Sequence, residues 1–264
     1  MNSSAYHSQL LPIMQGIKVL SISKTNILNT QIVFPEQKYQ NKIANFLSLI
    51  DQRIEKQRQL VENLKKYKRG LFEQIFKEYG NINVKLKDLL IEKNEKSKIN
   101  NEYEIISSTK QGLFLQSEYF NKQAASENTI GYKILRKKQV VFSPQNLWMG
   151  NINFNSDFEI GIVSPSYKIY DINPEYNSYY VGLILKSSKA LKEYVLASEQ
   201  GASIVRRNLN LEMFNEITLK FPDKTLQDKL ADYMQTIEKS VKRQDEILND
   251  ILKLKQGLLQ QMFI

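Results

Sequence analysis

Cysteine is absent from the chain, and histidine occurs once, at His7, among 264 residues. Without cysteine there are no disulfide bonds and no thiolate nucleophile or metal ligand. A single histidine argues against imidazole-based acid–base catalysis and against a zinc site. None of the ten glycines belongs to a phosphate-cradling motif. We therefore expect no catalytic residue, no metal and no cofactor in this chain.

Long apolar runs are also absent. No stretch of eighteen consecutive apolar residues occurs, so the sequence predicts no membrane-spanning helix. Residues 1–15 lack a charged start followed by an apolar run, so we expect no signal peptide. These absences favour a cytoplasmic protein with no membrane partner. The 37 lysines and arginines outnumber the 28 aspartates and glutamates, which gives a net charge of +9. That excess favours a polyanionic partner.

The strongest positive feature is an internal repeat, because residues 34–76 recur without a gap at residues 221–263. Each copy opens with Phe-Pro, has a glutamine five residues after that proline, and closes with Gln-Ile-Phe or Gln-Met-Phe. Most other positions exchange one residue for a similar one. A duplicated segment on either side of a different domain indicates pseudo-symmetry.

Both copies have the apolar spacing of a long helix, alternating four and three residues over more than four heptads. The seam positions of the first copy are Ile43, Leu47, Ile50, Ile54, Gln57, Val61 and Leu64. Those of the second copy are Leu230, Met234, Ile237, Val241, Gln244, Leu248 and Ile251. Each helix would be roughly 60 Å long, with its proline in the first turn. So narrow a seam needs a partner helix, and the simplest partner is the other copy, folded back antiparallel.

Gln57 and Gln244 are matching polar residues near the middle of the two seams. Antiparallel packing would bring them together, where their amides could hydrogen-bond and fix the register at some cost in stability. The alternative is that both glutamines are partly solvated and have no role in register.

The repeat divides the chain into four parts. Residues 34–78 and 221–264 are expected to be the two helices, and residues 79–220 a globular domain between them. Residues 15–33 resemble residues 200–220 with a two-residue difference in length. We therefore expect residues 1–33 to be the remnant of a second copy of the globular domain, whose other part is missing.

The central domain has the pattern of a mixed α/β domain. Strand candidates lie at residues 103–107, 139–143, 150–154, 159–163, 166–171 and 216–221, with an Asn-Ser-Asp turn between the third and fourth. Residues 84–90 suggest a short helix start. Residues 174–196 have helical spacing, with Tyr180, Leu183, Ile184, Leu191 and Val195 facing inward. The expected fold class is α+β: one α/β domain inserted between two long helices that form an antiparallel coiled coil.

This layout resembles the specificity subunits of Type I restriction-modification systems. The resemblance covers nearly the whole chain and rests on the paired helices, on residues 140–144 (VVFSP), on residues 164–170 (SPSYKIY) and on residues 201–211 before the last strand. It implies that residues 79–220 are a target recognition domain that reads double-stranded DNA. It also implies that the two helices are spacers on which modification (methyltransferase) subunits dock, and that a restriction subunit joins through the complex.

The chain departs from that family in having one recognition domain where the family has two. Pairing with a second copy, or with another specificity chain, would restore two reading domains. A homodimer would then require a palindromic split target, since its two halves are related by two-fold symmetry.

Three residues before the last strand are candidate DNA contacts: Arg206, Arg207 and Asn208. Arginine can fork onto guanine or hold a phosphate, and asparagine pairs with adenine. Gln145, Asn146 and Trp148 lie in a second loop, which offers amides for base edges and one aromatic ring. An ordinary core position is the equal alternative for Trp148.

Four further cations are candidates for phosphate contacts. Arg136, Lys137 and Lys138 form a run before a strand, and a solvated surface explains such a run equally well. Lys110, at a strand end, is a weaker candidate.

Two faint catalytic patterns also occur. Residues 171–176 (DINPEY) partly match the Asn-Pro-Pro-Tyr loop of amino-methyltransferases, but the second proline is missing. Asp223 and Asp228 resemble a nuclease carboxylate pair, but a helix start favours such charges without any catalysis.

Three functions remain open on the sequence alone. The first is the DNA-reading subunit of a Type I complex. The second is a stand-alone dimeric DNA-binding regulator, and the third is a non-productive adaptor or inhibitor that binds modification subunits. Two related helices around one domain favour the first over the second, because a regulator needs only one dimerisation helix.

Overall fold

The computed structural model describes residues 4–16, 19–31, 35–78, 80–119, 128–200 and 207–262. The chain forms two compact units. One consists of residues 1–67 and 237–264, and the other of residues 68–236. The long helices α3 (Gln37–Glu78) and α9 (Lys224–Met262) contribute residues to both units. Within the described residues, no helix has the length and apolarity needed to cross a membrane.

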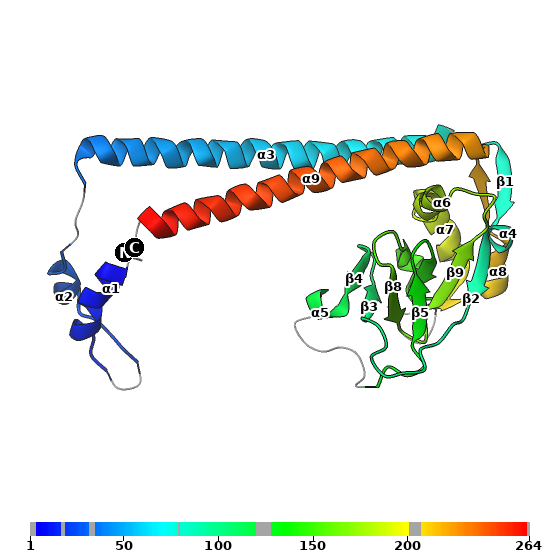
Figure 1. Cartoon of the computed structure of the whole chain (residues 1–264), viewed down its shortest axis with the longest axis horizontal. Helices are drawn as coiled ribbons and strands as arrows, with labels where there is room; N and C mark the ends of the chain where they lie inside the picture. Colours follow the sequence, from blue (N-terminus) through cyan, green and yellow to red (C-terminus); the bar gives the residue numbers. More distant parts are fainter. Residues whose placement is uncertain are drawn as a thin grey trace. The chain divides into compact units, whose positions relative to one another are not determined.

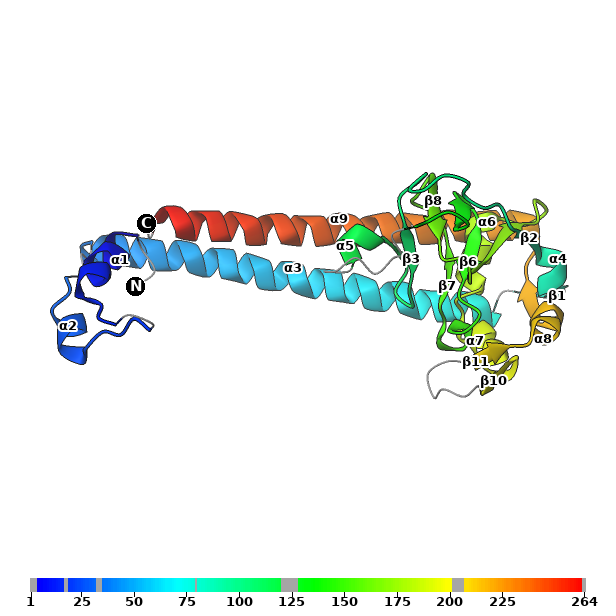
Figure 2. The same cartoon turned by 90° about the horizontal axis from the view of Figure 1, so that it is seen from below.

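In the first unit, α3 and α9 run antiparallel and side by side (Figures 1 and 2). Ile54, Val61 and Ile237 are buried between them. Seam positions of this unit that are only half-buried are Ile43, Leu47, Ile50, Leu64, Val241, Gln244, Leu248 and Ile251. Among the described residues each helix has only one partner, so its seam is covered from one side and the side chains at the edges of the seam stay partly exposed to solvent.

The expected contact between the two seam glutamines is present. Gln57 is buried, and its side-chain nitrogen lies 2.9 Å from both the side-chain oxygen and the backbone carbonyl oxygen of Gln244. Two ion pairs also join the helices, Lys65 with Asp245 and Asp51 with Lys255. Of these two pairs, the earlier residue of α3 is paired with the later residue of α9, as antiparallel helices require.

Both long helices begin in the same way, two residues after a proline. The Gln40 amide donates to the backbone carbonyl of Pro35 at 2.8 Å, and the Gln227 amide donates to that of Pro222 at 2.9 Å. The prediction that each proline lies in the first helical turn was therefore wrong, because each lies just before the helix. In both repeats the side chain of this glutamine therefore links the preceding proline to the first turn of the helix.

Residues 4–31 contain α1 (Ser4–Leu10), the short helix η1 (Leu11–Ile13) and α2 (Lys24–Leu28), with an antiparallel bridge between Gln15 and Ser21. The Ser23 side chain caps α2 by accepting from the backbone N–H of Asn26 at 3.1 Å. When the two Phe-Pro repeats are aligned, Ser23 matches Asn210, whose side chain caps the short helix Leu211–Glu216 in the same way. Residues 23–28 therefore share their local structure with the end of the central domain.

The second unit contains the central domain. Its sheet pairs are β1 with β12, β3 with β4, β5 with β8 and β10 with β11, beside a four-stranded antiparallel sheet in the order β2-β9-β6-β7. The strand bounds are β1 Ile82–Lys85, β2 Leu90–Lys93, β3 Ile106–Ser108, β4 Leu113–Leu115, β5 Lys133–Arg136, β6 Val140–Phe142, β7 Ile152–Phe154, β8 Ile160–Val163, β9 Lys168–Ile172, β10 Ser198–Gln200, β11 Arg207–Leu209 and β12 Thr218–Phe221. The short helices are α4 Leu86–Leu89, α5 Gln116–Tyr119, η2 Leu147–Met149, α6 Ser178–Ile184, α7 Ser188–Leu196 and α8 Leu211–Glu216.

The four-stranded sheet has a hydrophobic core on each face. Phe142 and Tyr170 belong to the larger core, which includes residues of α6, α7 and α8 as well as Ile75 of α3 and Met234 of α9. Val141 and Ile169 belong to the smaller core with Leu135 and Val163. Successive side chains of a strand point to opposite faces. The fully apolar run of β6 is therefore explained by burial on both faces.

Several sequence expectations for this domain need correction. The expected helix at residues 174–196 is two helices, because the Ser187 side chain caps a new helix by accepting from the N–H of Ala190. Because a new helix starts at this break, its buried face does not continue the buried face of the first helix. Tyr194 is buried, and Val195, which was expected to face inward, is 37% exposed. Strands β7 and β8 flank the Asn-Ser-Asp turn but do not pair with each other, since their partners are β6 and β5.

Candidate nucleic-acid interface

Three polar segments of the central domain meet at one end of the four-stranded sheet. The first is residues 143–151, which connect β6 to β7. The second is the turn at residues 109–112 between β3 and β4, closed by hydrogen bonds between Thr109 and Gly112. The third is the β10–β11 hairpin, which lies beside α7 in Figure 2. Hydrogen bonds between these segments define a common surface.

Asn151 joins the first two segments. Its side-chain oxygen accepts from the Ser108 hydroxyl at 2.7 Å, and its side-chain nitrogen donates to the Ser108 carbonyl at 3.0 Å. Asn153 adds a bond from its amide to the carbonyl of Thr109 at 2.8 Å. All three of Ser108, Asn151 and Asn153 are buried. Buried amides with every bond made hold their partners in one position, so the turn that carries Lys110 is fixed against β7.

Backbone bonds extend this connection to the hairpin. The Asn151 N–H donates to the carbonyl of Asn146 at 3.3 Å. The Arg207 N–H donates to the carbonyl of Gln145 at 3.2 Å. Arg207 and Gln145, candidates from two separate loops, are therefore in direct contact.

The Arg207 side chain lies over the indole of Trp148, with the guanidinium carbon 4.3 Å from the ring centroid. Trp148 is half-buried, so it belongs neither fully to the core nor fully to the surface. Its indole N–H is buried and has no acceptor among the described residues. A guanidinium stacked on an indole gains a cation–π attraction of about 0.5–2 kcal/mol, which restricts where the arginine can go.

Six of the ten predicted contact residues belong to these segments, and we call them the three-loop surface: Lys110, Gln145, Asn146, Trp148, Arg207 and Asn208. Lys110, Gln145 and Asn208 are exposed, and the other three are half-buried. Arg206 lies outside the described residues. The chemistry of the surface is that of amides, two cations and one aromatic ring, which suits base edges and phosphates.

The remaining three predicted residues, Arg136, Lys137 and Lys138, lie at the opposite end of β6, before its first residue. Arg136 forms a two-point ion pair with Glu95 at 2.8 and 3.2 Å, which raises the pKa of its guanidinium. Lys137 is paired with Glu159. Two of these three charges are thus partnered within the domain, and the run is not brought to the three-loop surface.

Sequence reasoning missed the polar residues that support the surface. Ser108 and the two buried asparagines, Asn151 just before β7 and Asn153 within it, carried no recognisable motif. One signal was available, since these asparagines alternate with the apolar residues Ile152 and Phe154. Asparagine is rare inside strands, so this pair marks a position where a neighbouring loop is bound.

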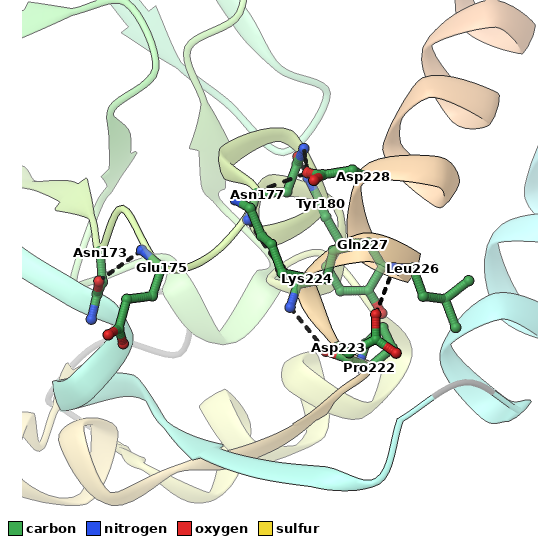
Figure 3. Close-up of polar contacts among 10 residues, drawn as sticks. All are labelled: Asn173, Glu175, Asn177, Tyr180, Pro222, Asp223, Lys224, Leu226, Gln227 and Asp228. Atoms are coloured by element: carbon green, nitrogen blue, oxygen red, sulfur yellow. Dashed lines mark hydrogen bonds and ion pairs between the residues drawn. The ribbon is translucent and has the colours of Figure 1, made fainter.

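The carboxylate pattern, Asp223 with Asp228, has a structural role at the start of α9 (Figure 3). The Asp223 carboxylate caps the helix by accepting from the Leu226 N–H at 2.9 Å. Asp228 accepts from the Asn177 amide at 2.7 Å, and Asn177 also caps α6 through the Tyr180 N–H at 2.9 Å. Asp228 thus holds the loop before α6 against α9, and Asp223 caps α9, as a helix-start charge preference predicts.

No cluster of histidine, cysteine or carboxylate side chains among the described residues is arranged to hold a metal ion. A cavity of about 660 Å³ in the second unit is lined by Lys189, Lys192 and Lys220 around an apolar floor. Its one carboxylate, Glu73, accepts a hydrogen bond from Ser188 at 2.7 Å. The lining therefore contains no carboxylate pair of the kind used in general acid–base chemistry.

A second apolar stripe follows α3 in the first unit, adjacent to the seam. Tyr39, Phe46, Leu60 and Tyr67 recur at multiples of seven residues and are between 43% and 53% exposed. Leu49 is also exposed. A helix whose only partner is another helix of a two-stranded coil needs the narrower seam alone. The apolar face of α3 is thus wider than its contact with α9 requires.

No family model and no curated protein matches the sequence. Solved structures do match along its whole length. The S subunit of a Type I restriction-modification system from M. genitalium is 16% identical, with a TM-score of 0.55, over 98% of this chain and 70% of that one. The HsdS subunit from Thermoanaerobacter tengcongensis is 13% identical, with a TM-score of 0.54, over 99% of this chain and 67% of that one.

A third match is a chain from a study of the assembly and conformational transition of the type I R-M system. It is 14% identical, with a TM-score of 0.55, over 99% of this chain and 68% of that one. The chain therefore has the fold of Type I specificity subunits. The expected α+β class, with one mixed domain inserted between two long antiparallel helices, is confirmed.

Proposed function

We propose that this chain is the DNA-recognition subunit of a Type I restriction-modification complex. The observation that carries the proposal is the likeness to solved specificity subunits over 98% and 99% of the chain, both long helices included. The chain supplies sequence reading, and a modification subunit supplies methyl transfer. In this role the chain has no catalytic residue and no cofactor of its own, and it acts in the cytoplasm.

The three-loop surface is the proposed DNA-reading surface. Gln145 and Asn146 present carboxamides, which pair with adenine in the major groove, and Arg207 presents a guanidinium, which pairs with guanine. Lys110 is proposed to contact a phosphate from its own turn. Arg136 and Lys137 are proposed only as secondary phosphate contacts, since a carboxylate already partners each. Lys138 remains a proposed phosphate contact.

The exposed stripe on α3 is the proposed docking surface for modification subunits. Phe46 and Leu60 are apolar and solvent-facing on a helix that already has one partner. An additional helix from a modification subunit would cover them and complete a bundle. The restriction subunit would then join through the modification subunits.

Pairing of two copies of this chain is the proposed way to obtain two recognition domains. A symmetric dimer reads two identical half-sites, so the target would be a palindrome interrupted by a spacer. Pairing with a different specificity chain would give an asymmetric target. The sequence of the methylated sites distinguishes the two cases.

The test is co-expression with a modification subunit from the same organism, followed by co-purification and sequencing of methylated bases in the host DNA. We expect a stable complex and methylation at one split motif. Methylation without this chain, or none with it, would contradict the proposal. A stable complex that methylates no site would support the non-productive adaptor. Specific DNA binding without any modification subunit would support the stand-alone regulator.

A further inference from the structure

We propose that Arg207 reads a base, specifically a guanine, and that Trp148 is the positioning residue that makes this possible. The inference rests on the function proposed above and deepens it by separating base reading from phosphate binding within the three-loop surface. It follows from three features of Arg207: its stack on the indole, its backbone anchor and its unneutralised charge.

Arg207 is restrained both at its guanidinium and at its backbone. Its guanidinium carbon lies 4.3 Å from the centroid of the Trp148 ring. Its backbone N–H donates to the carbonyl of Gln145 at 3.2 Å, three residues before that tryptophan. A free arginine loses about 1.5–2 kcal/mol of rotamer entropy on binding a ligand. An arginine that is already restrained does not lose it again, which favours a contact that needs one fixed direction.

The charge of Arg207 is available to a ligand. No carboxylate forms an ion pair with Arg207 within the described residues, whereas Arg136 of the same domain is paired with Glu95 at 2.8 Å. The segment to which its backbone is bonded carries the uncharged amides of Gln145 and Asn146. An unpaired guanidinium among neutral amides matches the mixed donor and acceptor pattern of base edges better than a row of phosphates.

A planar fork distinguishes a guanine contact from a phosphate contact. The guanidinium donates two parallel hydrogen bonds to the O6 and N7 of guanine, and lysine cannot reproduce that geometry. A phosphate contact depends mainly on charge, which lysine retains. The guanidinium carbon lies over the Trp148 ring, and no described residue forms an ion pair with Arg207, so its N–H groups are available for such a fork.

The stack itself can be tested without DNA, because Trp148 is the only tryptophan in the chain. Tryptophan emission of the full chain therefore reports on the surroundings of Trp148 alone. We expect Arg207→Ala to shift the emission spectrum, and we expect Lys138→Ala, which removes a charge from the other end of the sheet, to leave it unchanged. Identical spectra for the wild type and Arg207→Ala would overturn the inference.

The reading role is tested with the chain in complex with its modification subunit, by selection from a random duplex library. We expect Arg207→Lys to lose discrimination for guanine at one base pair by roughly 5- to 150-fold, with the slope of affinity against salt unchanged. Trp148→Leu should cause the same selective loss although the arginine is retained. Trp148→Phe keeps an aromatic face and should restore most of it. Lys220→Ala, which removes an exposed charge outside the three-loop surface, should leave the preferred sequence unchanged.

Each other outcome decides the matter. An unchanged preference in Arg207→Lys would show a phosphate contact and overturn base reading. Equal preferences in Trp148→Leu and the wild type would overturn the positioning role. If the wild-type complex selects no sequence, the proposed function fails and base reading fails with it. The emission shift of Arg207→Ala would then still show that the stack exists, which tells the two failures apart.

Discussion

The side-chain nitrogen of Gln57 lies 2.9 Å from two oxygens of Gln244, its counterpart in the other repeat. Each glutamine stands in a seam of apolar residues, and Gln57 is 5% exposed. A buried amide that finds its partner only in one alignment of the helices selects that alignment.

Replacing one member of this pair should destabilise the chain more than replacing both. Gln57→Leu leaves the Gln244 amide without its seam partner, and we expect a loss of about 1–3 kcal/mol in the free energy of unfolding. The double change to leucine should recover most of that loss, because two apolar groups pack without an unsatisfied amide. Urea unfolding measures both. Gln59→Leu, at an exposed position, is the control and should change little; equal losses for Gln57→Leu and Gln59→Leu would refute the register role.

Gly182 in α6 should not tolerate a methyl group. A Cβ atom there would lie 2.5 Å from the Cβ and 2.7 Å from the Cγ of Phe154 in β7. We expect Gly182→Ala to cost about 1–3 kcal/mol through overpacking. Gly70→Ala in α3 is the matched control, since nothing lies within 4 Å of its Cβ position, and it should stabilise by about 0.5–1 kcal/mol. Thermal unfolding of both variants checks the opposite signs, and a stabilised Gly182→Ala would contradict the close approach.

Asn151 should control the turn at residues 109–112 and not only overall stability. Asn151→Ala removes both bonds to Ser108, and we expect a loss of about 1–3 kcal/mol with faster hydrogen exchange at the amides of Thr109 and Gly112. Asn155→Ala is the matched control, because that buried asparagine makes two similar bonds to Phe158 at the other end of the sheet. It should destabilise the domain without selectively freeing the turn. Equal exchange at the turn in both variants would count against the proposed connection.

Glu216 should make stability depend on acid. Lys85 and Lys87 donate to its carboxylate at 2.7 and 2.6 Å and lower its pKa from 4.5 to about 2. Because the folded pKa is the lower one, the stabilisation is fully present above pH 4.5 and is lost as the pH falls towards about 2. Glu216→Gln should make the melting temperature depend less on pH across that interval. A pH profile identical to that of the wild type would show that this carboxylate contributes nothing.

The long helices were predictable because their information is local. The heptad spacing of each repeat is visible within a few turns, and pseudo-symmetry supplied the partner and even the contact of Gln57 with Gln244. The helix from residue 174 to residue 196 was less predictable. Its interruption depends on the single hydroxyl of Ser187, which caps a new helix although the apolar spacing continues through it.

The strand partners and the ion pairs were not predictable, because both depend on residues distant in the chain. Arg136 is neutralised by Glu95, which lies 41 residues away in sequence. Arg207 and Gln145 were identified as candidates from the chemistry of their side chains. The stack of Arg207 on Trp148 was not predicted, since nothing in either loop indicates which face of the indole is occupied.

The glutamine–proline bond at the start of each long helix has a consequence for how such chains are built. Gln40 and Pro35, like Gln227 and Pro222, are five residues apart, so each bond is complete within its own short segment. The bond itself therefore forms without any residue of the preceding domain. At the start of α9 the same glutamine also accepts from the Asn177 N–H at 3.0 Å. One repeated residue thus closes its own helix start at both places and, in the second, also fastens that helix to the domain before it.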